Sequence, residues 1–179
     1  NIILRLGKFV SLREMSLTIT RSDSTMYEAE RSRFYSTLKK VDILIVGESR
    51  PNNGTFFYFR NSVLYKYINE EIARYTNSYV QDFDCLEFFK SNNIFLDDLN
   101  QEPVNHLPRD IRRMLNRNAI QSLSDRIKKY QPRIVISILK GVREEVCKAI
   151  SLSSFCPDKV YFISFPANGQ QNNFRKEFL

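Results

Sequence analysis

The polar residues Glu48 and Ser49 directly follow an apolar, mostly β-branched segment, Val41 to Val46. Such a segment is typical of a strand that is buried on both faces of a parallel sheet. Gly47 ends the segment and turn-forming residues follow Ser49, so we expect a tight loop at the strand's carboxyl end. Open α/β sheets bind substrates at that end, and a carboxylate there can orient a water molecule and stabilise positive charge. Glu48 is therefore the first candidate for catalysis.

Two other apolar segments also run directly into polar or turn-forming residues. Ile94 to Leu96 is followed by the polar stretch from Asp97 to Glu102, and Val160 to Ser164 is followed by a loop with Pro, Asn and Gly. The carboxyl ends of parallel strands lie at one edge of a sheet, so three loops should converge there. They are Gly47 to Tyr58, Asp97 to His106 and Phe165 to Gln170.

Helical segments separate these strands and a further predicted strand, Arg133 to Leu139. Crossovers of this length connect parallel strands, so we expect an α/β fold, a three-layer α/β/α arrangement with a mainly parallel four-stranded sheet. A chain of 179 residues suits one such domain, residues 41–179. Residues 1–40 are expected to form an N-terminal extension that includes a surface helix, Tyr27 to Leu38. The other helices are expected at Val63 to Tyr75, Asp84 to Ser91, Ala119 to Tyr130, Val142 to Ile150 and Gln170 to Phe178.

The composition favours an anionic partner and argues against a metal site. Lys and Arg number 27 against 20 Asp and Glu, for a net charge of +7, which suits nucleic acid but also serves solubility alone. The three cysteines lack metal-type spacing and His106 is the only histidine, so we expect no metal, no iron–sulfur cluster and no other cofactor. Free thiols predict an intracellular protein. The apolar segment near residue 1 is too short to cross a bilayer, so we expect no membrane partner. We expect a monomer.

In their order along the chain, these motifs resemble those of the uracil-DNA glycosylase superfamily. GESRP, from Gly47, resembles the first motif of that superfamily, and the FFY that follows resembles its base-stacking segment. IFLDDLNQEP, from Ile94, resembles the second strand with its base-reading residue, and FPANGQQNNFRKEF, from Phe165, resembles the last motif and its helix. The resemblance implies a uracil-DNA glycosylase-like domain over residues 41–179. It also implies a monofunctional DNA glycosylase, which flips a nucleotide out of DNA and hydrolyses the bond between base and sugar.

The resemblance further implies roles for the residues that match the first motif. Glu48 would orient water and stabilise an oxocarbenium-like sugar, with Ser49 as the second catalytic residue and Gly47 against the base. Phe57 would stack on the base, with Tyr58 in reserve, because stacking on an aromatic ring contributes about 1–3 kcal/mol. The alternatives are that Glu48 caps a helix and that the aromatic run belongs to the core.

Asp98 falls where uracil-specific members of the superfamily usually carry an asparagine. An ionised aspartate only accepts hydrogen bonds, so it would repel uracil O4 and suit the exocyclic amino group of cytosine or a related base. The expected substrate is a deaminated, damaged or modified pyrimidine, and uracil itself is in doubt. Three alternatives stay open: a protonated Asp98 could donate, a shifted alignment would bring in Asp97 or Asn100, and Asp98 could cap a helix or pair with Arg109.

Phe165 replaces a histidine that in relatives stabilises negative charge on the leaving base. Losing one such donor typically lowers the rate about 10²–10³-fold. Asn168 and the amides of Gly169 and Gln170 could supply other donors or bind a DNA phosphate, and the alternative is a plain turn. We expect Asn168 to contact the base, and Gly169 and Gln170 to contact DNA.

Basic residues after Pro108 are candidates for contacts with DNA phosphates, above all Arg112 and Arg113. His106 could act as an acid in the pocket or simply bond to backbone.

No lysine matches a nucleophile position, so strand cleavage through a Schiff base is not expected. Two rival functions remain: a catalytically degenerate member that binds nucleic acid or protein, and an N-glycosidase for free nucleosides. The basic group comprises Arg109, Arg112, Arg113, Arg117, Arg126, Lys128 and Lys129.

Overall fold

The centre of the protein is a four-stranded sheet in the order β2-β1-β3-β4, in a computed structural model that describes residues 25–178. All three strand pairs are parallel, and Gly47 at the end of β1 lies opposite Asp98 at the end of β2. The apolar segments form these strands because a sheet covered on both faces needs apolar side chains on both. The strands are β1 (Ile43–Gly47), β2 (Ile94–Asp98), β3 (Ile134–Ile138) and β4 (Lys159–Ile163).

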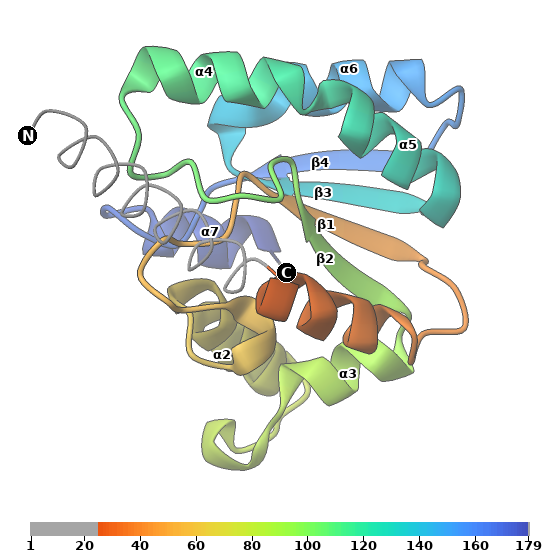
Figure 1. The fold of residues 1–179 in the computed structure, drawn as a ribbon. Coiled ribbons are helices and arrows are strands. Elements are labelled where there is room, and N and C mark those ends of the chain that lie inside the picture. The colour runs from red at the N-terminus through yellow and green to blue at the C-terminus, as the bar shows by residue number, and fades with distance from the viewer. Residues whose placement is uncertain (1–24, 179) are drawn as a thin grey trace, which may run out of the picture.

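Helices cover both faces of the sheet, so the predicted three-layer α/β/α arrangement is confirmed (Figure 1). α4, α5 and α6 lie on one face, and α2, α3, α7 and the helix of residues 25–35 lie on the other. The helices are α2 (Val63–Tyr75), α3 (Cys85–Ser91), α4 (Arg109–Asn118), α5 (Ile120–Tyr130), α6 (Arg143–Leu152) and α7 (Gln171–Phe178), with short 3₁₀ turns η1 (Phe57–Phe59), η2 (Val80–Asp82) and η3 (Lys140–Val142). Among residues 25–178, no helix is long and apolar enough to cross a membrane.

The sequence prediction missed α4, which had been expected only as a basic segment. Ile111 and Met114 on this helix are exposed, so its apolar residues do not mark a buried face. Its inward positions are instead polar, and one of them, Asn116, is buried. The usual apolar period of a surface helix is therefore missing.

The helix of residues 25–35 overlaps the predicted surface helix, Tyr27 to Leu38, and packs one face against the core. Tyr27 and Arg31 are buried, and the rings of Phe34 and Tyr58 lie 4.9 Å apart. The helix thus shares one core with the rest of the described chain. Residues 1–24 of the predicted extension lie outside the described residues.

The loop between β1 and α2 is fixed by short polar contacts. Asn61 accepts a hydrogen bond from the Phe56 amide at 2.7 Å. Ser62 caps α2, because its hydroxyl accepts from the Tyr65 amide at 3.1 Å. The intervening turn η1 therefore holds Phe57 at a defined place beside the end of β1.

Candidate functional site

A cavity of about 660 Å³ opens where the strands end, and its wall includes Gly47, Asp98, Ile138 and Ser164. The chain leaves β1 toward β2 on one side and β3 toward β4 on the other. Neighbouring strands whose connections diverge in this way leave a crevice at their carboxyl ends, the usual ligand site of open α/β sheets. The convergence predicted from the three loops is therefore observed.

The cavity wall brings together most of the residues that the motifs singled out. Tyr58, Arg113 and Gly169 belong to the predicted set but lie outside the wall, as does His106, which is exposed. The predicted residues that line the cavity are Gly47, Glu48, Ser49, Phe57, Asp98, Arg112, Asn168 and Gln170.

Glu48 lies just after β1, and α4 holds its carboxylate. Arg112 binds both oxygens, with its Nε 2.6 Å from Oε1 and its Nη2 donating to Oε2. Asn116, one helical turn further on, donates to Oε1 at 2.9 Å. These bonds use three of about four acceptor positions of a carboxylate, which leaves one on Oε2 for a water molecule. Glu48 therefore pairs with side chains inside α4 and does not cap a helix.

Asn100 and Ser49 fix the backbone around Glu48. The backbone N–H of Asn100 donates to the Glu48 carbonyl at 2.9 Å, and its side-chain amide donates to Asn116 Oδ1 at 2.5 Å. The Ser49 hydroxyl accepts from the Val104 amide at 3.1 Å. The loops after β1 and β2 are thus tied together, and the Asn100 side chain is engaged away from the cavity wall.

The Asp98 side chain lies across the end of β1. The space is open because Gly47, the last residue of β1, has no side chain. A Cβ on Gly47 would lie 2.4 Å from Asp98 Oδ1. The other oxygen, Oδ2, accepts from Arg31 Nη2 at 2.7 Å. Burial raises the pKa of Asp98 to about 6, against the opposing attraction of Arg31. Asp98 therefore pairs with Arg31 and not with Arg109, and it is mostly ionised at neutral pH.

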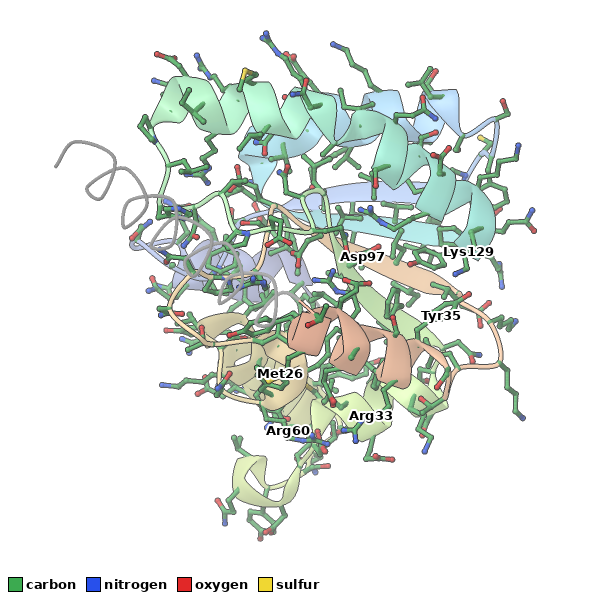
Figure 2. The ribbon with its side chains drawn as sticks, viewed as in Figure 1. Met26, Arg33, Tyr35, Arg60, Asp97 and Lys129 are labelled. Atoms are coloured by element: carbon green, nitrogen blue, oxygen red, sulfur yellow. The ribbon has the colours of Figure 1, made fainter. Side chains whose placement is uncertain are left out.

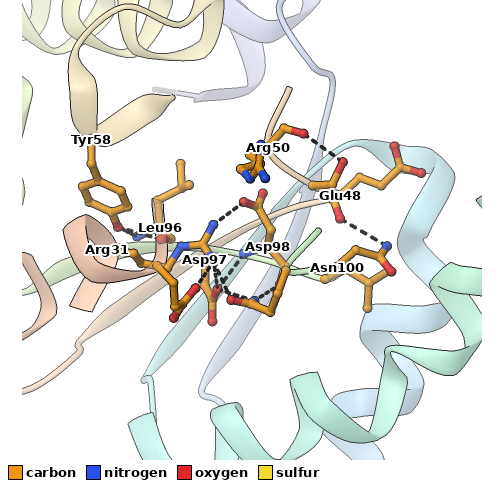
Figure 3. Close-up of polar contacts among 12 residues, drawn as sticks. Arg31, Glu48, Arg50, Tyr58, Leu96, Asp97, Asp98 and Asn100 are labelled. Carbon is orange, nitrogen blue, oxygen red and sulfur yellow. Dashed lines mark hydrogen bonds and ion pairs between the residues drawn. The ribbon is translucent and has the colours of Figure 1, made fainter. Parts of the chain in front are cut away.

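Asp97 has a structural place beneath this site. It is fully buried, and Arg126 Nε donates to its Oδ2 at 2.7 Å. Arg31 Nη1 lies 3.6 Å from its Oδ1, so Arg31 bridges Asp97 and Asp98 (Figure 3). Because Asp97 is absent from the cavity wall, a shifted alignment that makes it the base-reading residue finds no support.

The two aromatic candidates are both buried, with Phe57 3% and Tyr58 1% exposed, and they differ in what their side chains contact. Phe57 lines the cavity, with its ring packed against Tyr65 and Phe89. Tyr58 instead lies at the outer edge of β2, where its hydroxyl donates to the Leu96 carbonyl at 2.6 Å and accepts from the Leu96 amide at 3.0 Å. The Tyr58 hydroxyl therefore pairs with backbone groups at the open edge of β2. The prediction that Tyr58 could replace Phe57 against a base is wrong.

The loop after β4 reaches the cavity through Phe165, Asn168 and Gln170. Asn168 and Gly169 have φ angles of 52° and 79°, a left-handed turn that these two residue types tolerate. Glu177 of α7 anchors the loop, because its carboxylate accepts from the Ser164 amide and from Lys140 Nζ, both at 2.6 Å. The predicted turn is present, and Asn168 lies where it can contact a ligand.

The basic residues divide by position. Arg112 is bound to Glu48 and Arg126 to Asp97, so both serve carboxylates of the fold. Lys129 lies over the Tyr35 ring, 5.0 Å from its centre, near the end of α5 that precedes β3 (Figure 2). That end of the sheet is opposite the cavity. Arg109, Arg113 and Arg117 remain as exposed cations on α4, the helix that carries Arg112.

Sequence reasoning missed several side chains that build the site. Arg31 and Glu177 meet partners far away in the chain, so no local spacing could identify them. Asn116 lies four residues after Arg112, which was expected to contact DNA, and this spacing places both on one face of a helix once α4 is recognised.

No protein-family model matches this chain, and no curated protein is significantly similar to it in sequence.

Proposed function

We propose that this protein is a monofunctional DNA glycosylase of the uracil-DNA glycosylase superfamily that removes a deaminated, damaged or modified pyrimidine. One observation carries the proposal: Glu48, Phe57 and Asp98, from three different motifs, line the same cavity at the strand ends. They supply a carboxylate for the sugar, a flat ring for the base and an acceptor for its edge. A DNA substrate would place the protein inside the cell.

The size of the cavity supports a flipped nucleotide as the ligand. About 660 Å³ falls within the range of small-molecule pockets, roughly 300–1,000 Å³. A pocket of that size cannot admit a base pair, so the target nucleotide leaves the stack. The exposed cations Arg109, Arg113 and Arg117 on α4 then bind the flanking phosphates.

The reaction is a hydrolysis that Glu48 assists. The bond between sugar and base breaks, the base keeps the electron pair, and the negative carboxylate stabilises the cationic sugar. Water held at the remaining acceptor position of Oε2 attacks the anomeric carbon and loses its proton to Glu48. Because the sugar is already cationic, the attacking water needs only slight activation.

Base release from a substrate panel tests the proposal. The purified protein is incubated with single- and double-stranded DNAs that contain uracil, hypoxanthine, modified cytosines or normal bases, and with free nucleosides. We expect release of at least one pyrimidine from DNA and no strand cleavage. Release from nucleosides alone would favour the N-glycosidase, and silence from every substrate would reject a glycosylase.

A second candidate is a catalytically degenerate binding module of the same fold. The bidentate contact of Arg112 with Glu48 favours it, because the guanidinium neutralises the carboxylate that catalysis needs. This candidate predicts salt-sensitive DNA binding without base release, and the panel together with a binding titration separates the two.

A further inference from the structure

Arg50 is a cation in the cavity wall that the reaction described above does not use. It follows Glu48 by two residues, its side chain is only 9% exposed, and it lies close to Asp98 (Figure 3). Its guanidinium carbon lies 4.0 Å from the centre of the Tyr27 ring. This stacking fixes the plane of the guanidinium and leaves the N–H groups at its edge available.

Most hydrogen-bond donors of Arg50 have no protein partner within residues 25–178. A guanidinium has about five N–H donors, and within residues 25–178 Arg50 makes one side-chain hydrogen bond, a long one of 3.4 Å from Nη2 to Glu102. The buried side-chain nitrogens and oxygens that lack a partner in the described residues are Arg31 Nε and Ser137 Oγ. The unused donors of Arg50 are therefore open to the solvent in the cavity.

The other cations of the cavity wall are already engaged. Arg112 is bound to Glu48, and Lys140 lies 2.6 Å from Glu177. Asp98 is likewise matched by Arg31, at 2.7 Å. Glu48 and Asp98, the carboxylates of the wall, are thus paired with Arg112 and Arg31, and Arg50, whose ion pair with Glu102 is a single 3.4 Å contact, keeps donors for an anion.

We propose that Arg50 stabilises the negative charge of the departing base. The assignment rests on the proposed glycosylase function. When the bond between sugar and base breaks, the electron pair moves onto the pyrimidine, whose N1 and O2 then carry the charge. A guanidinium edge can donate two parallel hydrogen bonds to such an anion. Arg50 thereby supplies a charge-stabilising donor in a wall that has Phe165 where a histidine was expected.

The test compares leaving groups of different stability. Single-turnover base release is measured for the wild type and Arg50→Gln on DNA that carries uracil, 5-fluorouracil, cytosine or 5-fluorocytosine. Fluorine stabilises the pyrimidine anion, so a fluorinated base needs less help from the protein. We expect Arg50→Gln to release the unfluorinated base about 10²–10³-fold more slowly, and to lose much less on its fluorinated partner.

An equal loss on both members of a pair would overturn the assignment, since a purely structural role does not depend on the leaving group. An unchanged rate would overturn it as well. Arg50→Lys keeps the charge without the two parallel donors, so we expect a smaller loss with the same dependence on fluorine. This variant carries the test if Arg50→Gln does not fold. A wild type that releases no base from these DNAs or from the full panel described above would reject the proposed function itself, which is a distinct outcome.

Discussion

Glu48 follows β1, and Asp98 ends the neighbouring parallel strand β2. An arginine from a helix outside the sheet binds each carboxylate, yet the surroundings of the two ion pairs differ. Arg112, the partner of Glu48, keeps 35% of its side-chain surface exposed. Arg31, the partner of Asp98, keeps only 4%. Both carboxylates line the cavity, but Arg112 is open to the solvent there, whereas Arg31 is buried on the helix of residues 25–35.

The difference separates the two tasks that a base-removing site needs. A carboxylate that activates water must be reachable by water. A carboxylate that reads a base must be fixed in place, and burial in an ion pair achieves this at a cost in desolvation. The raised pKa of Asp98, about 6, is a sign of that cost. We therefore expect substitutions around Asp98 to change stability, and substitutions at Glu48 to change the reaction.

The largest expected effect on stability comes from Arg31→Met. It leaves Asp97 and Asp98 buried without their shared cation, which typically costs about 3–5 kcal/mol. Urea unfolding measures the change. Arg33→Met is the matched control, because Arg33 lies on the same helix with 76% of its side chain exposed. Equal effects of the two variants would break the comparison.

Asp98→Asn should change how stability depends on pH. Folding raises the pKa of Asp98 from 3.8 to about 6, so its contribution to stability is full below pH 3.8 and falls as the pH rises through 6. The loss amounts to about 3 kcal/mol at most. The variant lacks this titration, so its stability relative to the wild type should increase between pH 4 and pH 7. A constant difference in unfolding free energy across that range would contradict a desolvated Asp98.

Gly47→Ala should have a smaller effect, of about 1–3 kcal/mol, because the new methyl group collides with Asp98 Oδ1. Gly141→Ala is the control, since a methyl group there would lie 3.9 Å from its nearest neighbour, Leu139. Thermal unfolding of both variants sharpens the comparison. If both variants unfold like the wild type, the contact between Asp98 and the end of β1 is not tight.

Much of the fold and part of the site could be predicted from local patterns. The apolar segments marked the strands, and residues at their ends, such as Glu48 and Asp98, were identified because strand order and loop position are local properties. Of the cations behind them, Arg112 was expected to contact DNA, and Arg31 was not identified. Arg31 and Asp98 are separated by 67 residues, and no local spacing marks an arginine as buried among the apolar residues of its helix. Tyr58 was misassigned because an aromatic run does not indicate which ring meets a strand edge.

The most direct test of the account compares Glu48→Gln with Asp98→Asn in single-turnover base release, on one set of DNAs that contain uracil, cytosine or modified cytosines. Glu48→Gln should slow release of every base by about 10³-fold, with the fold and DNA binding intact, because it removes the charge that stabilises the cationic sugar. Asp98→Asn should instead change which base is released, toward uracil, because an amide both donates and accepts. Activity retained by Glu48→Gln, or the same uniform loss in both variants, would contradict the division of roles between the two carboxylates.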